Sequence, residues 1–211
     1  MKKFTFTLMA FACLCVPAAA ATINTTFDAW TLAPVVLGDK QFTYIAGGSN
    51  FNNAAMTFTS TVFPTQIVHD VDVQFAPGLT NTTIDLDYSI LVLNPLFHIS
   101  GMGLDAQIGA LGTNFDLTKT YYNSPGHVGQ IAQLTSVNGG NVSILGNFGQ
   151  LIYVHVTSTV PAGNEIDSFR DGYIQSSVPE PASFLLAGFG VLGLVSLNWV
   201  RRRATAKSDR L

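Results

Sequence analysis

Four stretches of the chain alternate apolar and polar side chains with a period of two, and this alternation constrains the fold more than any other feature. The stretches are residues 56–62, 67–75, 84–92 and 152–160, and they are rich in Thr, Val, Ile, Phe and Tyr. Successive side chains of a β-strand point to opposite faces, so the pattern is typical of strands with one buried face. The sequence therefore predicts an all-β domain.

Clusters of Gly, Pro, Asn and Ser separate these stretches, as expected between strands. The clusters lie at residues 46–50, 77–78, 94–95, 124–126 and 138–141. The Asn-Gly-Gly-Asn cluster at 138–141 predicts a hairpin between strands at 131–137 and 142–145. About eight to ten short antiparallel strands, each with one apolar face, favour a jelly-roll-like β-sandwich over residues 22–177.

The middle of the chain is acidic, although the whole chain carries a formal net charge of only −3. Residues 22–177 contain three basic and eleven acidic side chains, a net charge of −8, and the compensating basic residues lie near the two ends. An acidic surface repels phosphate backbones. We therefore expect no nucleic-acid partner.

Residues 1–21 have the three parts of a secretory signal peptide. Lys2 and Lys3 form a positive head, an apolar stretch follows, and a run of small residues that includes Ala20 and Ala21 ends the segment. This pattern predicts export through the secretion translocon and cleavage by signal peptidase after Ala20 or Ala21. Both cysteines lie inside the segment, so we expect a mature domain without disulfides.

A second apolar segment, at residues 182–200, has the length of a membrane span. As a helix it would extend about 28 Å, close to the hydrocarbon thickness of a bilayer. Arg201, Arg202 and Arg203 follow directly, and a basic cluster at the end of a span stays in the cytoplasm. The sequence predicts one C-terminal transmembrane helix, a cytoplasmic tail at 204–211 and a domain on the periplasmic side of the inner membrane.

The segment before this span is Val178-Pro179-Glu180-Pro181, and its two prolines favour an extended, non-helical backbone. Pro-Glu-Pro, an apolar span and an arginine cluster over residues 178–203 resemble the PEP-CTERM sorting signal, which is also labelled an ice-binding protein C-terminal domain. The resemblance implies that an exosortase recognises this signal and removes the tail. It implies a transient stay in the inner membrane, then delivery to the cell surface or extracellular matrix. It says nothing about the activity of the domain.

Two pairs of aspartates are candidate metal ligands, because residues two apart share one face of a strand. The pairs are Asp70 with Asp72 and Asp85 with Asp87. They would bind Ca²⁺ if loops added carbonyl oxygens, but a solvated outer face is the simpler explanation. The histidines lack the spacing of a zinc site; they are His69, His98, His127 and His155. His69 and His155 fit ordinary strand positions. We expect no cofactor, with Ca²⁺ as the open alternative.

Thr57, Thr59 and Thr61 form a row on one predicted strand. Rows of this kind resemble ice-binding surfaces, which need the row repeated on neighbouring strands, while Thr is also simply a good strand former. Residues 37–42 include a Gly-Asp-Lys-x-Phe stretch similar to one in other exported PEP-CTERM proteins of unassigned function. Neither feature decides the function.

The sequence contains no nucleophile elbow, P-loop or complete dinucleotide fingerprint. It therefore favours a non-enzymatic, exosortase-processed protein of the surface or matrix, associated with exopolysaccharide or biofilm. The alternative is a binding module for carbohydrate or calcium, whose sugar-stacking candidates are Trp30, Tyr121 and Tyr122, although burial of these rings is the simpler expectation. A hydrolase stays open because catalytic carboxylates can be distant in sequence.

Overall fold

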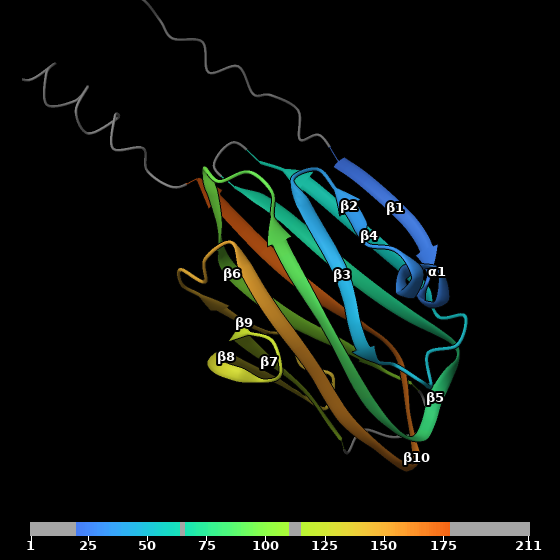
Figure 1. Cartoon of the computed structure of the whole chain (residues 1–211). Coiled ribbons are helices and arrows are strands. Elements are labelled where there is room, and N and C mark those ends of the chain that lie inside the picture. The colour runs from blue at the N-terminus through green and yellow to red at the C-terminus, as the bar shows by residue number, and fades with distance from the viewer. Residues whose placement is uncertain (1–19, 64–65, 110–114, 178–211) are drawn as a thin grey trace, which may run out of the picture. The chain divides into compact units, whose positions relative to one another are not determined.

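The computed structural model describes residues 20–63, 66–109 and 115–177. These residues form ten β-strands and one short helix, which confirms the predicted antiparallel all-β domain (Figure 1). The elements are β1 (Ala20–Thr26), α1 (Phe27–Leu32), β2 (Val35–Leu37), β3 (Lys40–Gly47), β4 (Ala55–Val62), β5 (Ile67–Val92), β6 (Phe97–Ile108), β7 (Asp116–Ser124), β8 (Val128–Val137), β9 (Val142–Leu145) and β10 (Leu151–Ser177).

The predicted membrane span at 182–200 and most of the predicted signal peptide lie outside the described residues. Among the residues that are described, no helix has both the length and the apolar character needed to cross a membrane. The two candidate cleavage residues, Ala20 and Ala21, begin β1 and pair with Thr61 and Ser60 of β4. Cleavage there would still leave Thr22–Thr26 paired, so the predicted site and the strand are compatible.

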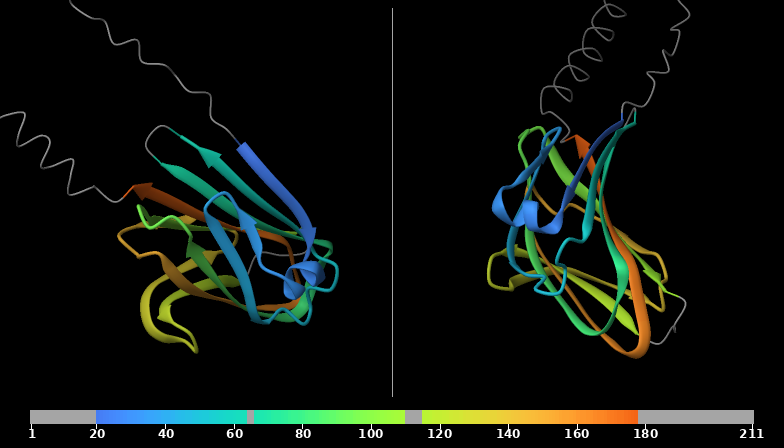
Figure 2. Two further views of the ribbon diagram at one scale, coloured as in Figure 1. Left: turned by 45° about the horizontal axis from the view of Figure 1, so that its top comes forward. Right: turned by 90° about the vertical axis from the view of Figure 1, so that its right-hand side faces the viewer.

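The strands form one continuous antiparallel sheet that folds into two layers, which share β5 and β10. Layer A has the order β1-β4-β5-β10-β6-β9. Layer B has the order β2-β3-β5-β10-β7-β8. Figure 2 shows the layers nearly edge-on in its right-hand view, joined at the end where β5 and β10 bend.

The predicted strands were expected to be short, but β5 and β10 have 26 and 27 residues and pair along most of their length. The turn predicted at residues 77–78 is therefore wrong: the chain bends there and continues as the same strand into the other layer. The ladder is interrupted between Gln74 and Leu79, so Pro77 stands where its missing N–H costs no strand pair.

The hairpin predicted between 131–137 and 142–145 is also wrong. β8 pairs with β7 in layer B, whereas β9 pairs with β6 in layer A, so the connection between them crosses from one layer to the other. Asn138 and Gly139 do adopt positive φ angles of 50° and 80°, as the turn signal requires. The local signal predicted the turn correctly but not the strand partners, because pairing depends on apolar faces of strands that are distant in sequence.

The core lies between the two layers and consists of the apolar residues of the alternating stretches. Helix α1 closes one part of it: Thr26 caps the helix, and Phe27 and Trp30 are buried. Trp30 packs edge-on against Phe58, and its indole N–H donates to the Phe42 carbonyl at 3.2 Å. Helix α1 therefore anchors the segment between β1 and β2 to layers A and B together.

Candidate functional site

The predicted aspartate pairs lie on the same long strand but on opposite outer surfaces. Asp70 and Asp72 belong to the part of β5 in layer A, where their neighbours His69 and Val71 point into the core. Asp85 and Asp87 belong to the part in layer B, where Ile84 and Leu86 point inward. The bend of β5 therefore separates the pairs, and they do not form one acidic site.

Asp70 and Asp72 border a polar groove beside Arg170 of β10. Two shallow pockets of about 140 and 170 Å³ meet there and share Asp105 and Arg170. Burial raises the pKa of Asp70, the Arg170 guanidinium lowers it and Asp72 raises it further. Within the part of the chain that the structure describes, the carboxylates of this groove do not bring three ligand atoms within 4.8 Å of one another.

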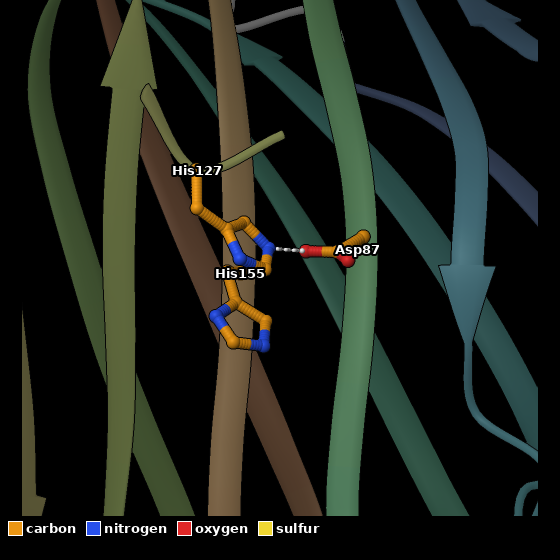
Figure 3. Close-up of side chains that lie close together, drawn as sticks. All are labelled: Asp87, His127 and His155. Atoms are coloured by element: carbon orange, nitrogen blue, oxygen red, sulfur yellow. Dashed lines mark hydrogen bonds and ion pairs between the residues drawn. The ribbon is translucent and has the colours of Figure 1, made fainter. Parts of the chain in front are cut away.

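Asp87 lies in a different setting, because two histidines meet at it (Figure 3). Asp87 Oδ1 accepts a hydrogen bond from His127 Nε2 at 2.9 Å, and Asp85 Oδ1 accepts one from His155 Nε2 at 2.9 Å. The two imidazole rings stack with centroids 4.1 Å apart and planes at 17°. Potential ligand atoms of Asp87, His127 and His155 all lie within 4.8 Å of one another. We call these three residues the Asp87 cluster.

Three elements build the Asp87 cluster. Asp87 and His155 are direct neighbours in the β5–β10 register, so strand pairing fixes their side chains on the outer face of layer B. His127 comes from the turn between β7 and β8, where Gly126 and His127 have positive φ angles of 71° and 60°. Few side chains adopt this conformation, although His is among those that tolerate it. The turn folds His127 back over β10.

A pocket of about 150 Å³ adjoins the Asp87 cluster. Asp87 and His127 form part of its wall, Tyr122 and Tyr153 supply aromatic rings, and Ile45 adds apolar surface. Tyr122 stacks on His127 with ring centroids 5.3 Å apart. The pocket thus combines hydrogen-bonding groups with apolar ring faces, a combination that suits small polar ligands with apolar faces.

Sequence reasoning missed this arrangement. It proposed Asp85 and Asp87 as ligands together with loop carbonyls, and it read His155 as an ordinary strand histidine. The sequence does contain two signals for this arrangement. The period of two places His155 on the outer face of its strand, and Ser-Pro-Gly before His127 predicts a turn. What the sequence lacked was the pairing of β5 with β10 across 68 residues, which places Asp87 beside His155.

The other predicted aromatic and threonine candidates have different surroundings. Trp30 and Tyr121 are buried in the core, and only Tyr122 of the three stacking candidates is partly exposed. Thr57 and Thr59 pair with Asn24 and Thr22 of β1 on one side. On the other side they pair with Asp72 and Asp70 of β5. The threonine row is therefore not repeated on β5.

A buried ionic cluster joins the two layers behind the pocket. Lys119 of layer B lies with its Nζ 2.9 Å from Asp171 Oδ1 of layer A, and both side chains are enclosed. Tyr88 donates a hydrogen bond to Asp171 and its hydroxyl lies 2.5 Å from that of Tyr173. Burial lowers the pKa of Lys119 to about 8 and raises the pKa of Tyr88 and Tyr173. Because these side chains are almost completely buried, we assign the cluster a structural role.

A second polar cluster bridges the layers near the β2–β3 turn. Lys40 of layer B donates to Gln175 Oε1 of layer A, and Gln175 donates to Asp39 Oδ2 at 2.5 Å. His69 Nε2 lies 3.2 Å from Gln175 Oε1. Burial lowers the pKa of Lys40 to about 8, and burial together with the Lys40 charge lowers the pKa of His69 to about 4. Gly38, at a φ of 62°, makes the turn that directs Lys40 inward.

The described residues thus define a class: a two-layered antiparallel β domain with a carboxylate–histidine cluster on one outer face. Residues 177–203 match the PEP-CTERM protein-sorting motif, which confirms the predicted sorting signal. The chain therefore carries a PEP-CTERM sorting signal, which implies an exported protein that is directed to exosortase and anchored transiently at the membrane. Pro179, Glu180, Pro181, Arg201, Arg202 and Arg203 fall inside the match but outside the described residues, and their individual roles stay predictions.

No curated protein matches the chain. Among solved structures it is similar to a Bacillus endospore appendage from a family of disulfide-linked pili, at 18% identity and a TM-score of 0.31 over 54% of this chain and 89% of that one. It is also similar to TmCBM61 in complex with β-1,4-galactotriose, at 9% identity and a TM-score of 0.24 over 79% and 90%. The mannan-binding module TmCBM27 gives 10% identity and a TM-score of 0.27 over 76% and 100%. Similarities this low assign neither a fold nor a ligand.

Proposed function

We propose that the domain is a non-catalytic, polysaccharide-binding component of the cell surface or extracellular matrix. The observation that carries this proposal is the pocket beside the Asp87 cluster, on a protein whose sorting motif directs it out of the cytoplasm. Sugars present hydroxyl groups and apolar C–H faces together. Asp87 and His127 supply hydrogen-bonding partners for the former, and the partly exposed rings of Tyr122 and Tyr153 supply stacking surfaces for the latter.

The strand order supports a jelly-roll type of sandwich for this binding domain. The two halves of β5, the two halves of β10, and β6 to β9 make eight segments. In layer A they follow the order first half of β5, second half of β10, β6, β9; in layer B, second half of β5, first half of β10, β7, β8. This order supports a double Greek-key arrangement of the jelly-roll type. Strands β1 to β4 extend both layers at one edge.

Binding is tested by a pull-down of the exported protein on exopolysaccharide from its own host. We expect retention by the polysaccharide, and at least about a tenfold loss in Tyr122→Ala, since stacking contributes on the order of 1 kcal/mol or more. Phe63→Ala is the matched control, because Phe63 is an aromatic ring that is 43% exposed and lies outside the pocket. Equal retention of all three proteins, or no retention of the unchanged protein, would overturn the proposal. A turnover screen on glycans and esters checks that the domain has no catalysis of its own.

The sorting part of the proposal is tested by the intact mass of the mature protein in cells with and without exosortase. We expect a chain that ends near Pro179–Pro181 only when the enzyme is present. A species that keeps Arg201 to Leu211 in both strains would remove the main support for a role in the matrix.

A further inference from the structure

We infer that Asp87, His127 and His155 form a binding site for one zinc-type transition-metal ion. The inference goes beyond polysaccharide binding and does not depend on it. It begins from the two Asp–His hydrogen bonds that strand pairing and the β7–β8 turn place side by side. A metal ion would replace the protons that these pairs share.

The donor atoms need only a small adjustment to coordinate an ion. With bonds of about 2.0–2.2 Å, a tetrahedral zinc ion holds its ligand atoms roughly 3.4 Å apart. The ligand atoms of the Asp87 cluster lie within 4.8 Å of one another, so each has to move by less than about 1 Å. The imidazole rings are nearly parallel, at 17°, and must tilt so that their lone pairs converge. The torsion that tilts them, χ2 of histidine, is broad and soft.

The chemistry of the donor set decides the kind of ion. Two imidazole nitrogens and one carboxylate suit Zn²⁺, and also Cu²⁺ or Ni²⁺, whereas Ca²⁺ takes oxygen ligands only. Asp85 Oδ1 lies 2.9 Å from His155 Nε2 and adds a second negative charge beside the ion. The inferred ion therefore belongs to a different class of metal from Ca²⁺, which the aspartates alone had left only as an open alternative to no cofactor. The pocket shares Asp87 and His127 with the site, so a fourth coordination position can face it.

Two independent surface ion pairs would explain each Asp–His contact but not the stacking of the two histidines. The two rings lie face to face with centroids 4.1 Å apart, which places ligand nitrogens of both histidines in the same small volume beside Asp87. The side chains of Asp87, His127 and His155 are 23%, 45% and 19% exposed. An ion therefore has access from solvent, while Asp87 and His155 are held by two paired strands and His127 by the β7–β8 turn.

The test uses the exported protein, stripped of metal with a chelator and titrated with Zn²⁺ by calorimetry. We expect one ion per chain, and no displacement of that ion by excess Ca²⁺. His127→Ala and His155→Ala should each weaken Zn²⁺ binding by at least about tenfold, since even outer-sphere partners of a metal contribute that much. Co²⁺ gives a second readout: the visible absorption of a four-coordinate ion should appear with the unchanged protein and disappear in both variants.

His98→Ala is the matched control, because it removes a histidine from β6, outside the Asp87 cluster. It should bind Zn²⁺ like the unchanged protein. His127 lies in an exposed turn, so its replacement leaves the strands in place, which circular dichroism verifies. Zn²⁺ binding that is absent, or equally strong in His127→Ala and in His98→Ala, would overturn the inference.

Discussion

Acid should destabilise the domain through His69, which is enclosed between the two layers. Its ring is fully buried, its Nε2 lies 3.2 Å from Gln175 Oε1, and Lys40 stands beside it. Burial and the Lys40 charge both penalise the imidazolium, so the folded domain holds His69 neutral. The unfolded chain imposes no such penalty. Protonation therefore favours unfolding.

The size of the effect follows from the pKa difference. The pKa of His69 falls from 6.5 to about 4 on folding. Between these pH values the unfolded chain binds a proton that the folded chain does not, so the free energy of unfolding decreases as the pH falls. A difference of about 2.5 in pKa corresponds to about 3.4 kcal/mol, fully present above pH 6.5 and lost by about pH 4. Lys40, with a pKa lowered to about 8, stays charged throughout this window.

Urea denaturation at a series of pH values between 7 and 4 measures this effect. The unchanged protein should lose about 3 kcal/mol more over this range than His69→Gln, in which the titrating group is gone. Carboxylates contribute equally to both proteins, so the difference isolates His69. His98→Gln removes a histidine that lies outside the polar cluster around His69. Its free energy of unfolding should keep the steep pH dependence of the unchanged protein. Parallel curves for His69→Gln and the unchanged protein would refute the reasoning.

Two further predictions concern stability at neutral pH, and both are measured by urea denaturation. Lys119→Met leaves the Asp171 carboxylate buried without its cation and should cost about 3–5 kcal/mol, while Lys119→Met with Asp171→Leu should cost less than the sum of the single changes; additive losses would contradict a coupled pair. Gly47→Ala puts a methyl group 2.1 Å from the Asp85 carbonyl oxygen at a φ of +87°, whereas Gly163→Ala, at +82°, meets no atom within 4 Å. Backbone strain alone should lower the free energy of unfolding by about 1–2 kcal/mol in each variant. The contact with Asp85 should make the loss in Gly47→Ala clearly larger, and equal losses would contradict this prediction.

The sequence predicts the strands well where the alternation of apolar and polar residues is sufficient to identify them. Alternation identified 56–62 and 84–92, and their apolar residues, such as Phe58 and Tyr88, are buried. It failed where strand partners matter. The Asn-Gly-Gly-Asn signal is local, and it cannot say that β8 pairs backward with β7 while β9 pairs with β6. Likewise Pro77-Gly78 reads as a turn, although the paired faces on both sides continue one strand.

The candidate site shows the same limit. The face of Asp85 and Asp87 follows from the side-chain period, but the position of His155 beside Asp87 depends on long-range register. The buried charges were also out of reach. Lys40 and Lys119 look like ordinary surface lysines in the sequence, because nothing local reveals that Gln175 and Asp171 of β10 will meet them inside the core.

The sharing of β5 and β10 by both layers sets the time at which an exported chain can fold. β10 is the last described strand along the chain, yet it lies at the centre of both layers and joins β5 to β6 and to β7. Until residues 151–177 have been exported, each layer is divided into two unconnected halves. Contacts between segments so distant in sequence also form slowly. The domain therefore completes its fold in one late step, and the sorting motif begins at residue 177, where β10 ends. Folding and arrival of the sorting signal at the membrane are consecutive events in the export of a single chain.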